Sequence, residues 1–336
     1  MDALLVADPG SVTWLTGHAA SIDTGPSPFA IGPFALIDAD GAVVLFASED
    51  EAAPEGVEAR HYRGFGVGPI DRIGAAHDAV RPFIEGRRLA IEAAAVPAGL
   101  VADTRSWVDA EAQVLAARAI KDPDEIALLR RALALCDTGQ AAARQAAREG
   151  ATELEIWTEV RRAIDAAAGA PTPLIADLVS GPRTAEVGGP PTDRELREGE
   201  LLLCDLVPRH GGVWGDSCAT IAVGEASAWA RGAHRQARDS LDAAIAEVRP
   251  GIRAGELDRL VRDALPELPH HVGHGIGGAS HEEPRIVPGN QMRLEPGMVI
   301  ALEPGVYGDR EGVRVERVVL VVDGGCVILS RHDVEL

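Results

Sequence analysis

Hydrophobic and polar positions alternate differently in the two parts of this chain. Before about residue 110, short apolar runs separate helix-like stretches, and residues 3–7 and 88–92 have the pattern of strands. The apolar runs 34–37 and 42–46 flank the sequence Asp-Ala-Asp-Gly, which is typical of a hairpin turn. This pattern predicts a small α/β domain over residues 1–115, without a cluster of candidate catalytic side chains.

Helix-start signals follow this region. Asp122 and Glu125 fit the N-cap and N3 positions of a capping box, with a proline at N1 between them. This helix is expected to stop at Gly150, a typical residue just beyond a helix end. Thr152 and Glu155 repeat the capping pattern and predict a second helix.

The second domain, predicted over residues 121–336, contains a faint internal duplication. Glu-Gly-Glu-Leu-Leu-Leu-Cys-Asp ends at Asp205, and Glu-Pro-Gly-Met-Val-Ile-Ala-Leu-Glu ends 98 residues later at Glu303. Asp216 and Glu316 are 100 residues apart. These offsets predict two similar halves, each with two helices followed by strands, and a site in the crevice between them.

The first half supplies two carboxylates on a predicted hairpin. Residues 201–206 form an apolar strand that we expect to end at Asp205, followed by a turn. Residues 213–223 form the return strand and carry Asp216. A charged side chain in a buried strand needs a partner, and a cation would supply it. The alternative is that Asp205 simply caps the end of the strand and binds no cation.

The second half repeats this arrangement. Glu303 follows the predicted strand 298–302, and Glu316 lies within the predicted strand 313–322. Alternation with a period of two places Arg314 on the same face as Glu316. The alternative to a metal ligand is an Arg–Glu pair on the surface. The similar placing of Asp205 and Asp216 in the first half argues against this alternative.

Four of the ten histidines lie between residues 270 and 281. His274 is flanked by glycines, which allow a close approach of the backbone. The alternative is that His274 is an ordinary loop residue, since glycines also flank such residues. His270 and His281 are candidates for binding a substrate carbonyl, whereas His271 is expected to point away and to have no role. One imidazole and four carboxylates suit two hard or borderline divalent ions.

Composition narrows the possible partners. The chain has 336 residues, 46% of them hydrophobic, and a net charge of −20, so a nucleic-acid partner is not expected. No apolar run is long enough to span a membrane, and the first residues do not resemble a signal peptide. The four cysteines fit no CxxC pattern, which favours free thiols in a reducing cytoplasm.

Taken with these motifs, the chain resembles the pita-bread metallopeptidases over nearly its whole length. These include methionine aminopeptidase, aminopeptidase P, prolidase and the creatinase-type relatives. It is most similar to the Xaa-Pro group, which comprises Xaa-Pro aminopeptidases and Xaa-Pro dipeptidases. The segments that carry the resemblance are Trp-Leu-Thr-Gly at 14–17, Ile-Lys-Asp-Pro-Asp-Glu-Ile at 120–126, Ser-Gly-Pro at 180–182, Pro-Thr-Asp-Arg at 191–194, Gly-His-Gly-Ile-Gly at 273–277, His-Glu-Glu-Pro at 281–284 and Glu-Pro-Gly at 303–305.

This resemblance implies an α+β fold: a creatinase-like α/β N-terminal domain, then a pseudo-two-fold pita-bread catalytic domain. It implies that Asp205 and Asp216 bind a first metal ion. Asp216, His274, Glu303 and Glu316 would bind a second, with Asp216 and Glu316 bridging the two. The carboxylate-rich set favours Mn(II), with Co(II), Zn(II) and Fe(II) as alternatives.

The resemblance also implies catalytic roles. A water or hydroxide between the metals would be the nucleophile, and Glu303 would be the general base. His270 and His281 would face the substrate, and Arg314 would orient the substrate or Glu316. A homodimer is also implied.

One departure concerns the substrate. The family usually has a histidine seventeen residues before the first metal-binding aspartate, and this chain has Gly188 there. The leading hypothesis is a hydrolase that cleaves the amide bond before proline in Xaa-Pro dipeptides or short peptides. A hydrolase of small metabolite amides on the same fold, and a catalytically weak binding protein, remain as alternatives.

Overall fold

The chain folds into two compact units in a computed structural model, which describes residues 1–19, 31–49, 51–64 and 67–336. The units are Met1–Arg118 and Ala119–Leu336. The division lies between the ends of the two domains predicted from the sequence, 1–115 and 121–336.

The first unit is built on a six-stranded sheet with the order β4-β3-β2-β1-β5-β6. Its strands are β1 (Ala3–Val6), β2 (Phe34–Asp38), β3 (Val43–Ser48), β4 (Glu58–Tyr62), β5 (Arg88–Ile91) and β6 (Ser106–Asp109). Its helices are α1 (Pro9–Thr16), α2 (Arg72–Ile84), the short 3₁₀ helix η1 (Ala98–Val101) and α3 (Glu111–Arg118). The predicted hairpin is present, because β2 and β3 pair antiparallel. The Trp-Leu-Thr-Gly segment closes α1, and Gly17 caps it with a φ of 71°.

The second unit begins with two long helices, α4 (Pro123–Ala146) and α5 (Glu153–Ala168). The Glu125 carboxylate accepts a 3.0 Å hydrogen bond from the backbone N–H of Asp122, as a capping box requires. The helix α4 ends at Ala146, two residues before the end that a C′ glycine at position 150 implies. Gly150 lies in the connecting turn, where its φ is 78° and its N–H donates to the carbonyl of Leu196.

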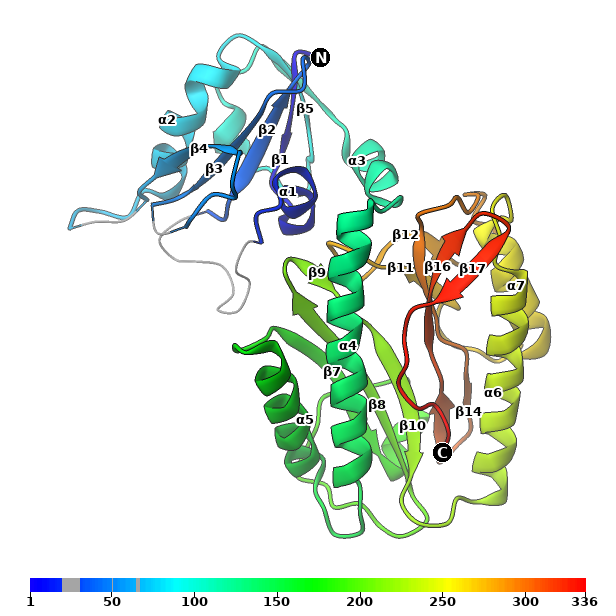
Figure 1. Ribbon diagram of the computed structural model, residues 1–336. Helices are drawn as coiled ribbons and strands as arrows, with labels where there is room; N and C mark the ends of the chain where they lie inside the picture. Colours follow the sequence, from blue (N-terminus) through cyan, green and yellow to red (C-terminus); the bar gives the residue numbers. More distant parts are fainter. Residues whose placement is uncertain (20–30, 50, 65–66) are drawn as a thin grey trace. The chain divides into compact units, whose positions relative to one another are not determined.

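Strands, two further α-helices and a short 3₁₀ helix complete this unit (Figure 1). The strands that form a sheet in the order β10-β8-β7 are β7 (Leu174–Ser180), β8 (Leu201–His210) and β10 (Ser217–Ala222), with β9 (Val213–Trp214) on β8. The sheet with the order β12-β11-β13-β16-β17 contains β11 (Gly273–Gly275), β12 (Glu282–Ile286), β13 (Val299–Leu302), β16 (Arg317–Val322) and β17 (Gly325–Ile328). The remaining elements are η2 (Gly181–Ala185), α6 (Ala228–Glu247), α7 (Ala254–Ala264), and the paired strands β14 (Gly305–Tyr307) and β15 (Gly312–Arg314).

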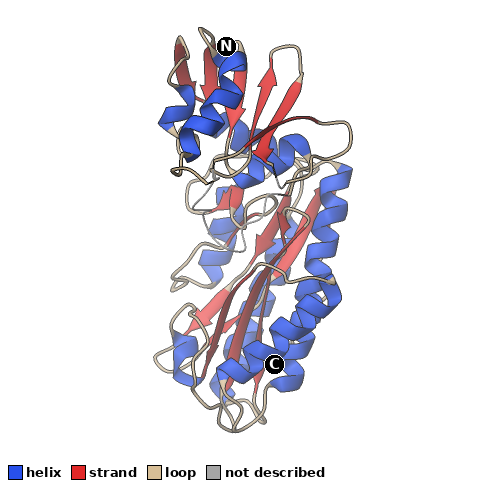
Figure 2. Cartoon of the chain, turned by 90° about the vertical axis from the view of Figure 1, so that its left-hand side faces the viewer, coloured by secondary structure: helices blue, strands red, loops and turns tan. Residues whose placement is uncertain are grey.

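Each half of the unit has its own apolar core. Ile156 and Val160 of α5 and Leu206 of β8 are fully buried in the first core, and Leu257 of α7 and Ile300 of β13 in the second. Burying each such side chain stabilises the fold by roughly 1.5–3 kcal/mol before entropy is counted. Figure 2 shows the strands of this unit as a layer with long helices running alongside. The α+β architecture with two similar halves is confirmed.

The two halves meet where β10 lies beside β15. The Thr220 hydroxyl and the Arg314 backbone exchange two 3.0 Å hydrogen bonds. The backbone N–H of Glu316 also donates to the carbonyl of Cys218, at 3.1 Å. These bonds hold the acidic residues of one half against those of the other.

Candidate metal centre

The two acidic residues of the first half lie on neighbouring strands. Asp205 is in the middle of β8, directly opposite Cys218 of β10 in the antiparallel register. The prediction that the strand ends at Asp205 was therefore wrong, because β8 continues to His210. Asp216 lies in the break between β9 and β10, where the predicted return strand is interrupted.

The second half places its acidic residues similarly. Glu303 directly follows β13, and Glu316 lies in the break between β15 and β16. The predicted strand over 313–322 is thus also interrupted. Asp216 and Glu316 occupy equivalent breaks in the two halves, and oxygens of Asp205, Asp216 and Glu316 lie within 4.8 Å of one another. Both breaks therefore deliver a carboxylate to the same cluster.

Without a cation, burial and mutual repulsion disfavour the charged form of these clustered carboxylates. Burial raises the pKa of Asp205 to about 6, against the opposing effect of Arg314. Burial and the charge of Glu316 raise the pKa of Asp216 well above its usual value, and burial and the charge of Asp205 do the same for Glu316. One buried oxygen of Asp205 and one of Glu316 have no hydrogen-bond partner within the described residues. Buried, clustered and partly unpartnered carboxylates are what a divalent cation would stabilise.

His274 adds a nitrogen donor to this cluster. It lies on β11, paired with Ala301 of β13, and is almost fully buried. Its Nδ1 is 2.9 Å from the carbonyl oxygen of Gly275, so in the neutral ring Nδ1 carries the proton and Nε2 keeps a free lone pair. That Nε2 is 3.5 Å from Asp216 Oδ2 and 3.4 Å from Glu303 Oε1. A neutral imidazole with a free lone pair among carboxylates fits a metal ion.

The glycines beside His274 have a packing role. A Cβ at position 273 would lie 2.1 Å from the carbonyl oxygen of Ala301, and one at position 275 would lie 2.2 Å from that of Glu283. The glycines therefore let β11 fit between its two neighbouring strands, which fixes the position of His274. The close approach of the backbone that the sequence predicted is thus an approach between strands.

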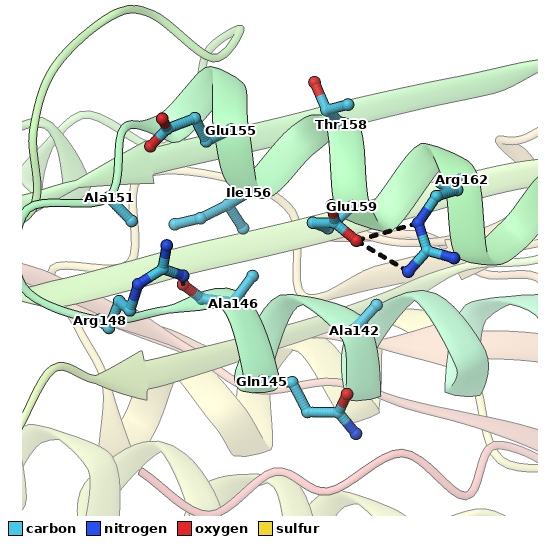
Figure 3. Close-up of a pocket in the computed structure, with 10 residues that line it drawn as sticks. All are labelled: Ala142, Gln145, Ala146, Arg148, Ala151, Glu155, Ile156, Thr158, Glu159 and Arg162. Carbon is cyan, nitrogen blue, oxygen red and sulfur yellow. Dashed lines mark hydrogen bonds and ion pairs between the residues drawn. The ribbon is translucent and has the colours of Figure 1, made fainter.

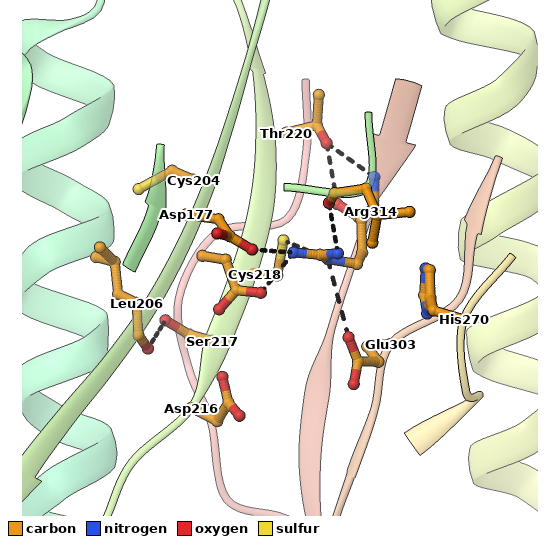
Figure 4. A network of polar contacts seen from close by, with 12 residues as sticks. Asp177, Cys204, Leu206, Asp216, Ser217, Cys218, Thr220, His270, Glu303 and Arg314 are labelled. Atoms are coloured by element: carbon orange, nitrogen blue, oxygen red, sulfur yellow. Dashed lines mark hydrogen bonds and ion pairs between the residues drawn. The ribbon is translucent and has the colours of Figure 1, made fainter. Parts of the chain in front are cut away.

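Arg314 is buried and bridges several groups (Figure 4). Its Nη2 donates to Asp205 Oδ2 at 2.6 Å and lies 3.6 Å from Asp177 Oδ2, and its Nε lies 3.9 Å from Glu303 Oε2. The sequence predicted a contact with Glu316 or the substrate. Its ion pairs within the described residues are with Asp205, Asp177 and Glu303, and none is with Glu316. Arg314 also lines the pocket, and its role toward the substrate stays a prediction.

His270 and His281 both line the same pocket. The Nε2 of His270 is 2.9 Å from the hydroxyl oxygen of Tyr307, and burial lowers the pKa of His270. The ring of His281 stacks on that of His274 with 3.9 Å between centroids, and burial lowers its pKa to about 4. The structure thus brings all the predicted site residues into one region.

His271 was wrongly expected to point away from the site. Its Nε2 is 2.8 Å from Glu303 Oε1, and its ring lies edge-on to those of His274 and His281. β11 begins only at Gly273, so His270 and His271 lie outside the strand and their side chains need not point to opposite sides. The number of histidines in this segment was the one feature of the sequence that indicated a place for His271 in the site.

Asp177 was also missed from the sequence. It pairs directly with Asp205 across β7 and β8, and no local motif marks it. Its carboxylate occupies the space beside Gly188, because a Cβ at position 188 would lie 1.9 Å from Asp177 Oδ2.

A pocket of about 220 Å³ opens onto this cluster. The lining residues are Ile175, Ala176, Asp177, Val187, Asp205, Val207, Asp216, His270, His271, His274, His281, Glu303 and Arg314. A larger pocket of about 530 Å³ lies between α4 and α5 (Figure 3). Its Arg162 and Glu159 pair with each other, and its lining includes none of the predicted site residues. The chemistry therefore belongs to the smaller pocket.

Fold and site together are those of the pita-bread class. The chain belongs to metallopeptidase family M24, whose description matches residues 127–323. The predicted family and the metallopeptidase class are thereby confirmed.

Relatives and solved structures agree with this assignment. A probable dipeptidase PepE of Mycobacterium tuberculosis is 34% identical over 227 residues, which span 65% of this chain and 60% of that relative. An uncharacterized peptidase of Staphylococcus aureus is 29% identical over 99% of this chain and 95% of its own. The prolidase structure from Pyrococcus horikoshii has a TM-score of 0.84 at 25% identity, covering 100% of this chain and 95% of that one. The dipeptidase PepE structure from Mycobacterium ulcerans has a TM-score of 0.81 at 25% identity, covering 100% and 92%.

No helix among the described residues is both long enough and apolar enough to cross a membrane.

Proposed function

We propose that this protein is a two-metal peptidase that cleaves the amide bond before proline in Xaa-Pro dipeptides or short peptides. The observation that carries the proposal is the cluster of Asp205, Asp216 and Glu316, with the Nε2 of His274 lying between Asp216 and Glu303. The preference for proline is supported by the similarity to structures described as prolidases, and dipeptides by the similarity to PepE.

The donor set divides between two ions in this proposal. Asp205 and Asp216 would hold the first, and Asp216, His274, Glu303 and Glu316 the second. Bound there, divalent ions would polarise the substrate carbonyl and lower the pKa of water. Oxygen donors dominate the set, which supports Mn(II) before Co(II), Zn(II) or Fe(II).

The chain's own groups would bind the substrate and move protons. The Glu303 carboxylate would take a proton from the attacking water and return it to the leaving nitrogen. His270 and His281 line the pocket and would face the substrate. His281 would donate to the substrate carbonyl as negative charge develops on its oxygen, whereas the Nδ1 proton of His270 bonds to the carbonyl of His271. Arg314 holds Asp205 in position through its 2.6 Å bond.

Mass spectrometry of the products tests the proposal. Mn(II)-loaded protein is incubated with Xaa-Pro and Xaa-Ala dipeptides, Xaa-Pro-Xaa tripeptides and peptides that start with Met. Cleavage restricted to the bond before proline is expected, and it should be absent in Asp216→Asn and Glu303→Gln, which keep the side-chain size. Equal cleavage of Xaa-Ala would refute the proline preference, and turnover by both variants would refute the metal mechanism.

A second candidate is a hydrolase of small metabolite amides, including cyclic amidine-like compounds. One observation favours it: the Asp177 carboxylate lies in the pocket beside Gly188 and would suit a cationic or amidine group. The same assay with a panel of small amides decides between the two, because turnover there without peptide cleavage would support this candidate.

We further propose a homodimer, which rests on the family resemblance alone. Light scattering during size-exclusion chromatography should give about twice the chain mass of 35.2 kDa. We also propose a reducing, cytoplasmic location, with which the four free cysteines are consistent.

A further inference from the structure

We propose that His271 is a positioning residue for Glu303, and that Arg285 fixes the His271 ring in the tautomer that donates from Nε2. The inference rests on the proposed function for its catalytic meaning, whereas the tautomer itself follows from the contacts of the ring. It goes beyond the metal-ligand set, because His271 would contact the ligand Glu303 without binding an ion.

The contacts form a chain of three side chains. Arg285 lies on β12, and its Nη2 is 3.1 Å from His271 Nδ1. His271 Nε2 is 2.8 Å from Glu303 Oε1. The His271 side chain is 20% exposed and that of Glu303 only 9%, so neither contact is a loose surface pair.

The direction of these bonds follows from the donor inventory. A guanidinium group has only N–H donors, so Arg285 must donate and His271 Nδ1 must accept. The proton of the neutral ring is then on Nε2, where it points at a carboxylate oxygen. His271 therefore has no lone pair on the nitrogen that faces the acidic cluster.

The neighbouring histidines have the opposite tautomer. The Nδ1 of His274 faces the carbonyl oxygen of Gly275 at 2.9 Å, and that of His270 faces the carbonyl oxygen of His271 at 2.7 Å. Because a carbonyl only accepts, both rings carry the proton on Nδ1. A nitrogen of His271 and one of His274 lie within 4.8 Å of each other. The two rings nevertheless have different roles, because Nε2 of His274 has a free lone pair for an ion whereas Nε2 of His271 donates a hydrogen bond.

Glu303 needs such a partner because it has two tasks in the proposed mechanism. A carboxylate that binds an ion and also transfers a proton must keep one orientation through both steps. A hydrogen bond from His271 to Oε1 holds that orientation, as groups behind metal ligands commonly do.

Kinetics of four variants test the role of His271. His271→Ala should lower kcat by about 10- to 100-fold with KM little changed, at saturating metal and with unchanged metal content. His271→Gln should restore most of the rate, because its amide nitrogen can donate from a similar position. Arg285→Met should reproduce part of the loss, and Arg285→Met with His271→Ala should be no worse than His271→Ala alone.

Arg293→Met is the matched control, because Arg293 is exposed and hydrogen-bonds only to a backbone carbonyl, that of Gly251, within the described residues. Loss of one ion per chain in His271→Ala, without rescue by glutamine, would overturn the proposal and make His271 a ligand. Independent losses from Arg285 and His271 would also overturn it.

A second measurement decides the tautomer without any turnover. Long-range ¹⁵N–¹H NMR of histidine-labelled protein loaded with diamagnetic Zn(II) should show His271 protonated at Nε2 and His270 protonated at Nδ1. His271→Ala and His270→Ala assign the signals, and His270 is the internal control. If His271 proves protonated at Nδ1, the inference fails. If the protein cleaves no peptide but shows these tautomers, only the proposed function fails.

Discussion

At the scale of single residues, Gly188 and Asp177 share one small space in the pocket wall. A methyl group at position 188 would lie 1.9 Å from Asp177 Oδ2, and the obstruction is the end of a side chain that can rotate. We expect Gly188→Ala to displace the Asp177 carboxylate, change KM, and alter the free energy of unfolding by no more than about 0.5 kcal/mol. Enzyme kinetics and urea unfolding measure the two effects.

Double substitution shows whether Asp177 is the cause. Asp177→Ala should change KM as Gly188→Ala does, and the two together should have the effect of one, because both remove the same carboxylate from the pocket. Gly189→Ala is the control, since its Cβ would approach the flexible end of Arg183, at 3.3 Å, and not Asp177. Additive effects on KM would contradict this explanation.

At the scale of elements, the start of α5 is the clearest case of local sequence determining structure. The Thr152 hydroxyl accepts from the N–H of Glu155 at 3.1 Å, and the Glu155 carboxylate accepts from the N–H of Thr152 at 2.9 Å. Thr152→Ala should lower the free energy of unfolding by about 1 kcal/mol. Thr158→Ala, at an exposed position inside the same helix, should be neutral or slightly stabilising. Urea unfolding measures the free energy of unfolding of both variants. Equal decreases would mean that the cap does not stabilise the protein more than an ordinary helix position does.

At the scale of the whole molecule, the acidic cluster should couple metal binding to stability. Ligands that bind only the folded state stabilise it by about 2.7 kcal/mol at a concentration 100 times Kd. Adding Mn(II) to metal-free protein should therefore raise its Tm, and EDTA should reverse the change. Asp216→Asn should raise the Tm of the metal-free protein, because it removes one of several mutually repelling buried carboxylates.

The same variant should lose most of the stabilisation that Mn(II) gives to the parent protein. Calorimetric scans with and without metal measure both changes, and Asp193→Asn, outside the pocket, is the control. A metal-free Asp216→Asn protein less stable than the parent would show that this carboxylate is not under electrostatic strain.

The sequence by itself determined the elements that depend on neighbours along the chain. The capping boxes at Asp122 and Thr152 bond only to residues within one helical turn, so the pattern was sufficient to locate α4 and α5. The duplication could also be predicted from the spacing between Asp205 and Glu303, because the same order of motifs recurs along the chain in each half.

Only the tertiary structure decided which side chains face the crevice. The breaks that turn Asp216 and Glu316 inward, and the pairing of Asp177 with Asp205, depend on strands that are distant in the sequence. His271 joins the site because Arg285 and Glu303 reach it from two other segments. Such contacts are set by packing between sheets, and a pattern of nearest neighbours along the chain does not contain them.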